Sequence, residues 1–251
     1  MTWNEMTSDP WYILSKYTEA RIALGRAGGS LPTRPLLKFQ LDHARARDAV
    51  ESALNIFSLE NQLNTMNLPF IKLNSQARDR AEYLKRPDLG RRLNNQSKTI
   101  LSQDKRAGSD IGIVVTDGLS AAAIDAQFIP FIHEMIPLLK SKQMSFSPIC
   151  LVEQGRVAIA DEIGAHLGAR LIFICIGERP GLSSPHSMGI YMTYHPQTGK
   201  TDESRNCISN IRAQGLSTKI AARKLMFLIE QSLRLKLSGV YLKEDTDLLS
   251  E

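Results

Sequence analysis

The spacing of apolar residues changes along the chain at about residue 110. Before that point apolar residues recur as they do on one face of a helix. Residues 9–30 follow a cap at Asp9-Pro10 and end in glycines, and residues 36–55 form a second amphipathic stretch. A connector rich in turn residues at 83–90 leads into a further helical stretch that ends near Ser102. These patterns predict a mainly helical region over residues 1–105.

After residue 110 the pattern becomes one of short apolar runs between helical stretches. The runs cover residues 111–115, 146–152, 171–176 and 190–194. The helical stretches cover residues 121–140, 157–167 and 218–237, and Pro130 and Pro137 are expected to kink or break the first of them. Continuous apolar strands that alternate with helices are typical of a parallel sheet covered on both faces. The sequence therefore predicts an α/β fold: a helical, basic N-terminal region (1–105), then a Rossmann-like α/β domain (106–251) with a largely parallel sheet.

Two loops of the second part stand where such sheets bind ligands. Asp117-Gly-Leu-Ser120 follows the first apolar run and Gly177-Glu-Arg-Pro-Gly181 follows the third, and open α/β sheets bind ligands beyond the carboxyl ends of their strands. Glu178 is thus a candidate ligand contact, with an ion pair to an arginine such as Arg179 as its structural alternative. Cys207 is expected in a polar loop before the last helix, and its alternative is a small buried hydrophobic residue.

The composition places the chain among globular proteins. Its 251 residues are 43% hydrophobic and 23% charged, which allows one large domain or two small ones with a sizeable core. No run of 18 apolar residues and no signal peptide are seen, so we expect no membrane span. The three cysteines form no Cys-x-x-Cys pair, which favours a reducing cytoplasm over disulfides or zinc.

The net charge of +5 is carried entirely by the first part of the chain. Residues 1–110 hold 17 Lys and Arg against 12 Asp and Glu, whereas residues 111–251 hold 14 of each kind. Such an excess is compatible with nucleic acid, with an acidic protein partner, with a phosphate-bearing ligand, or with an ordinary solvated surface.

Familiar catalytic motifs are missing or incomplete. Asp117-Gly118 follows the first strand without the further glycines of a dinucleotide fingerprint, and Thr198-Gly-Lys-Thr201 lacks the first glycine of a phosphate-binding loop. His133-Glu134 lacks the second histidine of a zinc protease helix, and no Gly-x-Ser-x-Gly elbow occurs. Asp42-His43 does not continue into Asp-x-His-x-x-Gly, the motif by which some cobalamin proteins replace the lower ligand of cobalt. What the residues alone leave is a ligand-binding α/β domain with a helical, basic appendage and no metal site.

Seven longer stretches together resemble one family, the small (light) subunits of ethanolamine ammonia-lyase. They occur in family order over about residues 10–243. The stretches are LGRAG (24–28), LLKFQLDHARARDAV (36–50), YLKRPDLGRRL (83–93), VVTDGLSAAAI (114–124), QGRVAIADEIGAHLGA (154–169), IGERPGL (176–182) and RNCISNIRAQGLS (205–217).

This resemblance implies a role in an adenosylcobalamin-dependent lyase that converts ethanolamine to acetaldehyde and ammonia. The family's large subunit holds the substrate and the catalytic residues, and the small subunit covers part of the cobalamin, which keeps its own dimethylbenzimidazole as lower ligand (base-on). The family's cofactor contacts correspond to Val157, Glu178 and Cys207. The expected partners are the large subunit and cobalamin, with no nucleic acid and no membrane.

Two other functions are compatible with the residues alone. One is a stand-alone α/β enzyme with a nucleotide cofactor, and the other is a basic RNA-binding module. The family's longer N-terminal extensions are associated with packaging in bacterial microcompartments, and about ten residues precede the match here. We therefore expect a cytoplasmic protein rather than an encapsulated one.

Overall fold

The computed structural model describes residues 9–103 and 108–243 of the chain. The helices are α1 (Thr33–Glu51), α2 (Ile56–Thr65), α3 (Arg80–Lys85), α4 (Asn95–Gln103), α5 (Ala121–Ser141), α6 (Ile159–Leu167) and α7 (Thr218–Leu235). The strands are β1 (Phe70–Asn74), β2 (Ile111–Thr116), β3 (Phe146–Glu153), β4 (Leu171–Gly177), β5 (Met188–Tyr194) and β6 (Arg205–Ile211).

One six-stranded mixed sheet forms the centre of the molecule. Its strand order is β1-β3-β2-β4-β5-β6. The pairings from β1 to β4 are parallel, and those of β5 with β4 and with β6 are antiparallel. The four predicted strands are confirmed, but β1 and β6 were not predicted. Because β1 precedes residue 105, residues 106–251 do not form the sheet alone, and the first part of the chain is not purely helical.

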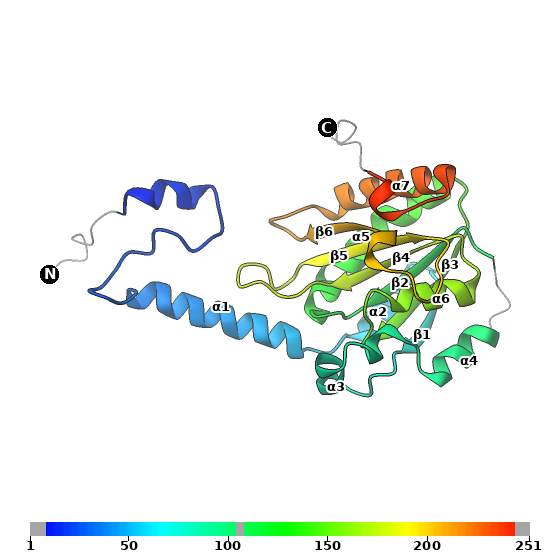
Figure 1. Cartoon of the computed structure of the whole chain (residues 1–251), viewed down its shortest axis with the longest axis horizontal. Coiled ribbons are helices and arrows are strands. Elements are labelled where there is room, and N and C mark those ends of the chain that lie inside the picture. Colours follow the sequence, from blue (N-terminus) through cyan, green and yellow to red (C-terminus); the bar gives the residue numbers. More distant parts are fainter. Residues whose placement is uncertain (1–8, 104–107, 244–251) are drawn as a thin grey trace.

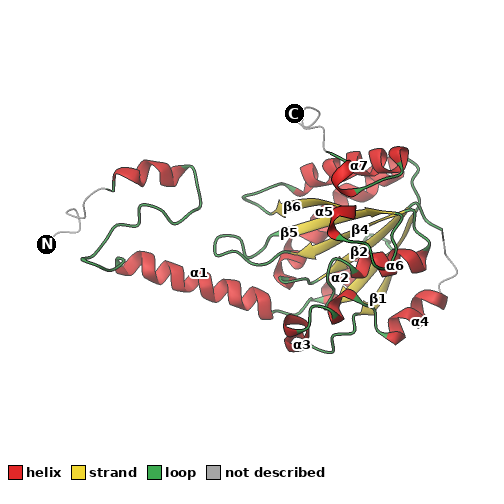
Figure 2. Cartoon of the chain, viewed as in Figure 1, coloured by secondary structure: helices red, strands yellow, loops and turns green. Residues whose placement is uncertain are grey.

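Helices cover both faces of the sheet (Figures 1 and 2). Helices α2, α5 and α7 share one apolar cluster with the sheet, and α4 and α6 belong to a second cluster on the other face. Strand β2 is followed by β3 on one side, and the chain then crosses to β4 on the other side of β2. The crossovers from β2 to β3 and from β3 to β4 run in opposite directions across the sheet. Because such crossovers are right-handed, α5 and α6 lie on opposite faces. The strand order therefore reverses at β2, which is where ligands bind in open α/β sheets.

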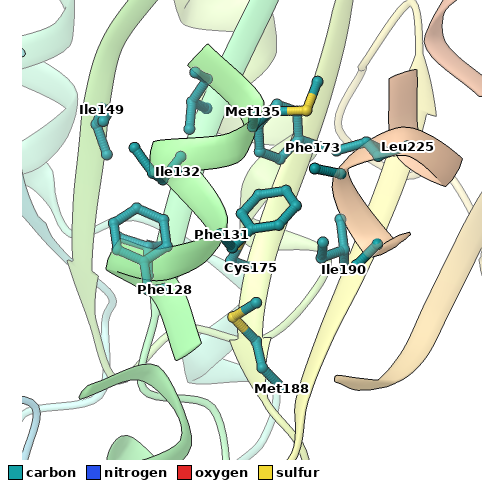
Figure 3. Packing of buried hydrophobic residues seen from close by; sticks show 14 of the residues in the cluster. Phe128, Phe131, Ile132, Met135, Ile149, Phe173, Cys175, Met188, Ile190 and Leu225 are labelled. Carbon is teal, nitrogen blue, oxygen red and sulfur yellow. The ribbon is translucent and has the colours of Figure 1, made fainter. Parts of the chain in front are cut away.

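Helix α5 is the main apolar element of the core (Figure 3). Phe131 of α5 meets Phe173 of β4 edge-to-face, with 6.2 Å between ring centroids. Alone among the described helices, α5 is long and apolar enough to cross a membrane, but it packs between the sheet and α7, which accounts for its apolar composition. The predicted break was wrong, because one helix runs through Pro130 and Pro137. Both prolines lie on its exposed side, where carbonyl groups left without a helical donor can bond to water.

The segment before α1 differs from the predicted helix at 9–30. Only a 3₁₀ helix at Pro10–Lys16 forms, capped by Asp9 as expected. The glycine-rich stretch makes a tight turn with a bridge between Ala27 and Ser30 instead of ending a helix. A short helix without a surface to pack on is marginal in water, and the chain gives this segment little burial.

Helix α1 is present as predicted, but it projects away from the body of the molecule (Figure 1). Of its 19 residues only Ala49 is buried. The segment before it doubles back beside it. We call residues 9–51, which comprise both, the N-terminal arm. Its large apolar side chains are exposed, among them Trp11 (65%) and Leu37 (59%), so the arm presents an apolar surface that this chain alone does not cover.

A buried ion pair ties the far edge of the sheet to α6. Arg205 of β6 and Asp161 of α6 are almost fully buried and bonded to each other, and Arg205 also donates to Asp202 and to the carbonyl of Lys200. One nitrogen of Arg205 and one oxygen of Asp161 lack a partner, and burial raises the pKa of Asp161 despite the arginine.

Replacing Arg205 by methionine should strongly destabilise the chain. The substitution leaves the Asp161 carboxylate buried without its charge partner, which typically costs about 3–5 kcal/mol. The free energy of unfolding from urea titration measures the effect. In Arg205→Met/Asp161→Leu most of that loss should be recovered, because no unpaired charge remains.

Arg86→Met is the matched control. Arg86 pairs with Asp88 on the surface, where both side chains are more than half exposed. Such pairs contribute at most about 1 kcal/mol. Equal losses for Arg86→Met and Arg205→Met would contradict the proposed importance of burial.

Candidate functional site

The carboxyl ends of β2, β3 and β4 enclose a depression of about 430 Å³, at the edge where the strand order reverses. We call it the strand-end depression. It is lined by Tyr83, Gly118, Leu119, Arg156, Val157, Ile176, Gly177, Glu178, Arg179 and Tyr191. Its volume lies within the range of about 300–1,000 Å³ that is common for small-molecule sites. Val157 and Glu178, two of the predicted cofactor contacts, thus line the same depression.

Two glycines allow the loops after β2 and β4 to cross closely. A Cβ atom on Gly118 would lie 2.3 Å from the carbonyl oxygen of Gly177, and a Cβ on Gly177 would lie 2.0 Å from that of Ser120. Gly118 also has a positive φ of 56°, which side chains disfavour. The amide of Leu119 donates to the carbonyl of Gly177 at 2.9 Å. This crossing fixes the position at which Glu178 leaves β4.

The segment 83–90 forms the opposite wall of the depression. The Tyr83 hydroxyl donates to the carbonyl of Gly155 at 3.0 Å, and the amide of Arg156 donates to the carbonyl of Gly90 at 2.7 Å. A Cβ on Gly90 would lie 2.9 Å from the Arg156 side chain. The guanidinium of Arg156 stacks on the Tyr83 ring, 4.2 Å from its centroid. Sequence reasoning did not select Tyr83 or Arg156, although both fall in stretches that carry the resemblance.

Arg80 and Asp117 form a buried charge network beneath this wall. Asp117 is 1% exposed, and it lies 3.3 Å from an Arg80 nitrogen. It also accepts hydrogen bonds from the Thr116 hydroxyl and from the amide of Gly118. Burial is the largest influence on this carboxyl and raises its pKa to about 6, while Arg80 and the hydrogen bonds act in the opposite direction.

Glu178 is held by hydrogen bonds rather than by an arginine. Its carboxylate accepts from the Ser187 hydroxyl at 2.6 Å and from the amide of Asn210 at 3.3 Å. Gly189 lies beneath it, because a Cβ there would come within 2.9 Å of the carboxylate. Among the described residues no ion pair involves Glu178, so the structural alternative with Arg179 is wrong.

Cys207 lies in edge strand β6, not in the predicted loop. Its neighbours Asn206 and Ser209 are polar because this edge is solvated, and the strand forms by pairing with β5. The residue is exposed rather than a buried hydrophobic residue. It pairs across the sheet with Tyr191, which lines the depression. Desolvation by neighbouring groups raises the pKa of the Cys207 thiol, a hydrogen bond from Tyr191 lowers it, and the Glu178 carboxylate raises it further.

Val157 lies just before α6 and is half-buried, packed against the apolar cluster of that face. The structure therefore brings Val157 and Glu178 into one depression and places Cys207 at its side through Tyr191. This clustering was not imposed by sequence proximity, because Val157 follows β3, Glu178 follows β4 and Cys207 lies within β6.

A larger hollow of about 700 Å³ lies under the N-terminal arm. It is open and is lined by the arm and by the loop at 182–185. Arg21 pairs with Asp42 within the arm, and Glu19 pairs with Arg212 at the end of β6. The strand-end depression, not this hollow, contains two of the three predicted ligand contacts, Val157 and Glu178.

Apart from Glu178, the lining of the strand-end depression contains no carboxylate or imidazole for acid–base chemistry. No histidine lines it, and burial raises the pKa of both Tyr83 and Tyr191, so these phenols stay protonated at neutral pH. Within residues 9–103 and 108–243, no cluster of His, Cys, Asp and Glu is suitable for a metal ion. The groups offered to a ligand are a carboxylate, two guanidinium groups, a phenol and apolar side chains.

Comparison with known proteins gives one consistent result. A family described as Ethanolamine ammonia-lyase light chain matches residues 8–243. The chain is 51% identical to a protein of Ralstonia nicotianae over 95% of this chain and 90% of the relative. It is 50% identical to one of Azotobacter vinelandii (96% and 90% covered) and 49% identical to one of Pseudomonas fluorescens (96% and 88%). Each of these relatives is named ethanolamine ammonia-lyase small subunit.

The buried Asp117 should make stability depend on pH between about 4 and 6. Its folded pKa of about 6 lies above the ordinary value of 3.8, so the folded state binds the proton more tightly. The resulting stabilisation is complete below about pH 4 and is lost as the pH rises to 6. A shift of this size corresponds to roughly 3 kcal/mol at most. Asp117→Asn should flatten the pH profile of the free energy of unfolding in that window.

Asp110→Asn is the control for this prediction. Asp110 lies before β2 and pairs with Arg170 near the surface, and its net pKa is lowered rather than raised. Its removal should therefore leave the profile between pH 4 and 6 close to that of the natural chain. A profile that Asp117→Asn leaves unchanged would show that burial does not control this carboxyl.

Proposed function

The chain belongs to the family of ethanolamine ammonia-lyase light chains, and from this membership we propose that it acts with a large subunit to bind adenosylcobalamin for the deamination of ethanolamine. The proposal has acetaldehyde and ammonia as products. It assigns to this chain the binding of the cofactor and assigns the catalytic residues to the large subunit. The observation that carries it is the convergence of Val157 and Glu178 in the strand-end depression, with Cys207 beside it.

The chemistry of the depression fits part of a cobalamin. Amide side chains surround a corrin ring and can donate to a carboxylate, and the apolar edge of the ring suits Val157, Leu119 and Ile176. Glu178 retains acceptor capacity beyond its bonds to Ser187 and Asn210. A depression of about 430 Å³ is small for a corrin with its nucleotide tail, so this chain is proposed to form one wall of a site that the large subunit completes.

When bound, adenosylcobalamin would supply the radical by cleavage of its Co–C bond. The residues of this chain bind and orient. Glu178 accepts hydrogen bonds from the cofactor, Val157 excludes water from its apolar edge, and the crossing of Gly118 and Gly177 keeps the wall rigid. The proposal takes the base-on form of the cofactor from the family, and no histidine lines the described depression.

The N-terminal arm is proposed to bind the large subunit. Its exposed aromatic and aliphatic side chains include Trp11, Tyr12 and Tyr17, and Tyr, Trp and Arg are enriched at protein interfaces. Arg34, Lys38 and Arg45 line the hollow beside them. This arrangement matches a partner surface that offers apolar pockets together with carboxylates.

The full chain should not deaminate ethanolamine alone, because the proposal assigns the catalytic residues to the large subunit. Co-expression with the large subunit should give activity that depends on added adenosylcobalamin, measured as acetaldehyde release. Turnover by the purified chain alone, or a complex that is active without the cofactor, would contradict the proposal.

Removing the Glu178 carboxylate should weaken cofactor binding. A hydrogen bond to a charged acceptor contributes about 1.5–3 kcal/mol, so Glu178→Ala should raise the KM for adenosylcobalamin roughly 10- to 100-fold. The KM for ethanolamine should change little, because the substrate is proposed to lie in the other subunit. Both constants are measured on the same preparation of the complex.

Two milder variants serve as comparisons. Ser187→Ala removes one bond that orients the carboxylate and should raise the cofactor KM less than Glu178→Ala does. Cys207→Ser keeps a hydrogen-bonding group of similar size, and its effect should be smaller still. An unchanged cofactor KM for Glu178→Ala at normal complex yield would rule out the assigned contact.

Deleting residues 1–30 should weaken assembly more than folding. The deletion removes Trp11, Tyr12 and Tyr17, which are exposed, and also Trp3, which lies outside the described residues. Loss of such anchors should raise the Kd for the large subunit about tenfold or more. Thermal unfolding of the truncated chain should stay near that of the full chain. Deleting residues 244–251 is the control, and equal binding by both truncated chains would argue against the arm.

A further inference from the structure

The strand-end depression contains a positive charge without a protein counter-ion. Arg156 follows β3 and reaches into the depression between Val157 and Tyr83. One of its terminal nitrogens donates to the carbonyl of Tyr83 at 3.3 Å. Its Nε is buried and has no hydrogen-bond partner, and within the described part of the chain Arg156 forms no ion pair.

The surroundings of Arg156 hold its guanidinium in place without neutralising it. The group stacks on the Tyr83 ring, and Arg80 stacks on the same ring with 4.9 Å to its centroid. Asp117, the buried carboxylate nearby, pairs with Arg80 instead. Glu178 is bonded to Ser187 and Asn210. The depression therefore contains two guanidinium groups, those of Arg156 and Arg179, and one carboxylate that already has partners.

A guanidinium whose Nε–H group is buried and unbonded is costly unless an anion or acceptor completes it. Arginine is also the side chain best suited to phosphate, because its planar fork can donate two parallel hydrogen bonds. Cobalamin carries amide groups around the corrin and one phosphodiester in its nucleotide tail. The phosphodiester is the peripheral anion that an arginine would select.

We propose that Arg156 binds the phosphodiester of the cobalamin nucleotide tail and thereby places that tail at the carboxyl end of β3. This assignment rests on the proposed function and adds an anion contact to the three residues expected from the family. Glu178 then meets the amide side chains of the corrin, and Arg156 meets the charged tail on the opposite wall. The stacking on Tyr83 keeps the guanidinium in position before the ligand arrives.

The test is a binding measurement with two corrinoids that differ only in the phosphate. Adenosylcobinamide phosphate and adenosylcobinamide are titrated into the complex of the full chain with the large subunit, and Kd is taken from the absorbance change. The natural complex should prefer the phosphate-bearing corrinoid about 10- to 100-fold. Arg156→Met retains the apolar stem over Tyr83, and it should bring the ratio of the two Kd values close to one.

Two further variants make the result specific. Arg156→Lys keeps the charge without the fork and should retain part of the preference, which also separates loss of the contact from loss of folding. Arg92→Met removes an exposed arginine that lies outside the depression, and it should leave the ratio unchanged.

The outcomes separate this proposal from the proposed function. If the natural complex binds both corrinoids equally, or if Arg156→Met weakens both by the same factor, the phosphate contact is overturned while cofactor binding stands. If Arg156→Met instead lowers the yield of complex and keeps the ratio, a carboxylate of the large subunit is the counter-ion, and the phosphate contact is again overturned. If the natural complex binds neither adenosylcobinamide phosphate nor adenosylcobalamin, both proposals fail.

Discussion

The guanidinium of Arg80 connects the parts of the chain that build the site. It donates to the carbonyl of Val50 at the end of α1 and to that of Gly118 after β2, and it reaches Asp117 and Gln154. The side chain is only 12% exposed, so these bonds form where water competes little. Without this residue the carboxylate of Asp117 would lie in the interior without a cation. The base of the arm and the ends of β2 and β3 therefore depend on one side chain from α3.

This connection explains why the first part of the chain belongs to the site although it precedes most of the sheet. Strand β1 pairs with β3, which brings α3 and the segment 83–90 to the carboxyl ends of the strands. There Tyr83 and Gly90 contact the turn that carries Arg156. A parallel sheet alone would line the depression only with the loops that follow its strands. The opposite wall of the depression comes from the segment 83–90, which the sequence predicted to be only a connector.

The sequence allowed most of the fold to be predicted wherever burial was complete. Strands β2, β3 and β4 are continuous apolar runs, and Glu178 could be placed at the end of β4 for that reason. Strands β1 and β6 could not be found, because each lies at an edge of the sheet and forms through pairing rather than through its own composition. The helix predicted over residues 9–30 was wrong for the opposite reason, because its apolar side chains have no surface in this chain to pack on. Val157 was selected as a candidate contact only through the family resemblance, because the apolar pattern around it is that of an ordinary helix start.

The same electrostatics that build the site also limit what it can do. Asp117 pairs with Arg80 beneath the wall and is 1% exposed. Its protonation therefore affects the stability of the fold and not a bound ligand. The phenols of Tyr83 and Tyr191 remain neutral because burial raises their pKa. Glu178 offers an acceptor and Arg156 a donor to a bound ligand. A wall of this kind can hold a ligand in one orientation, and the proposed function leaves the radical chemistry to the bound cofactor.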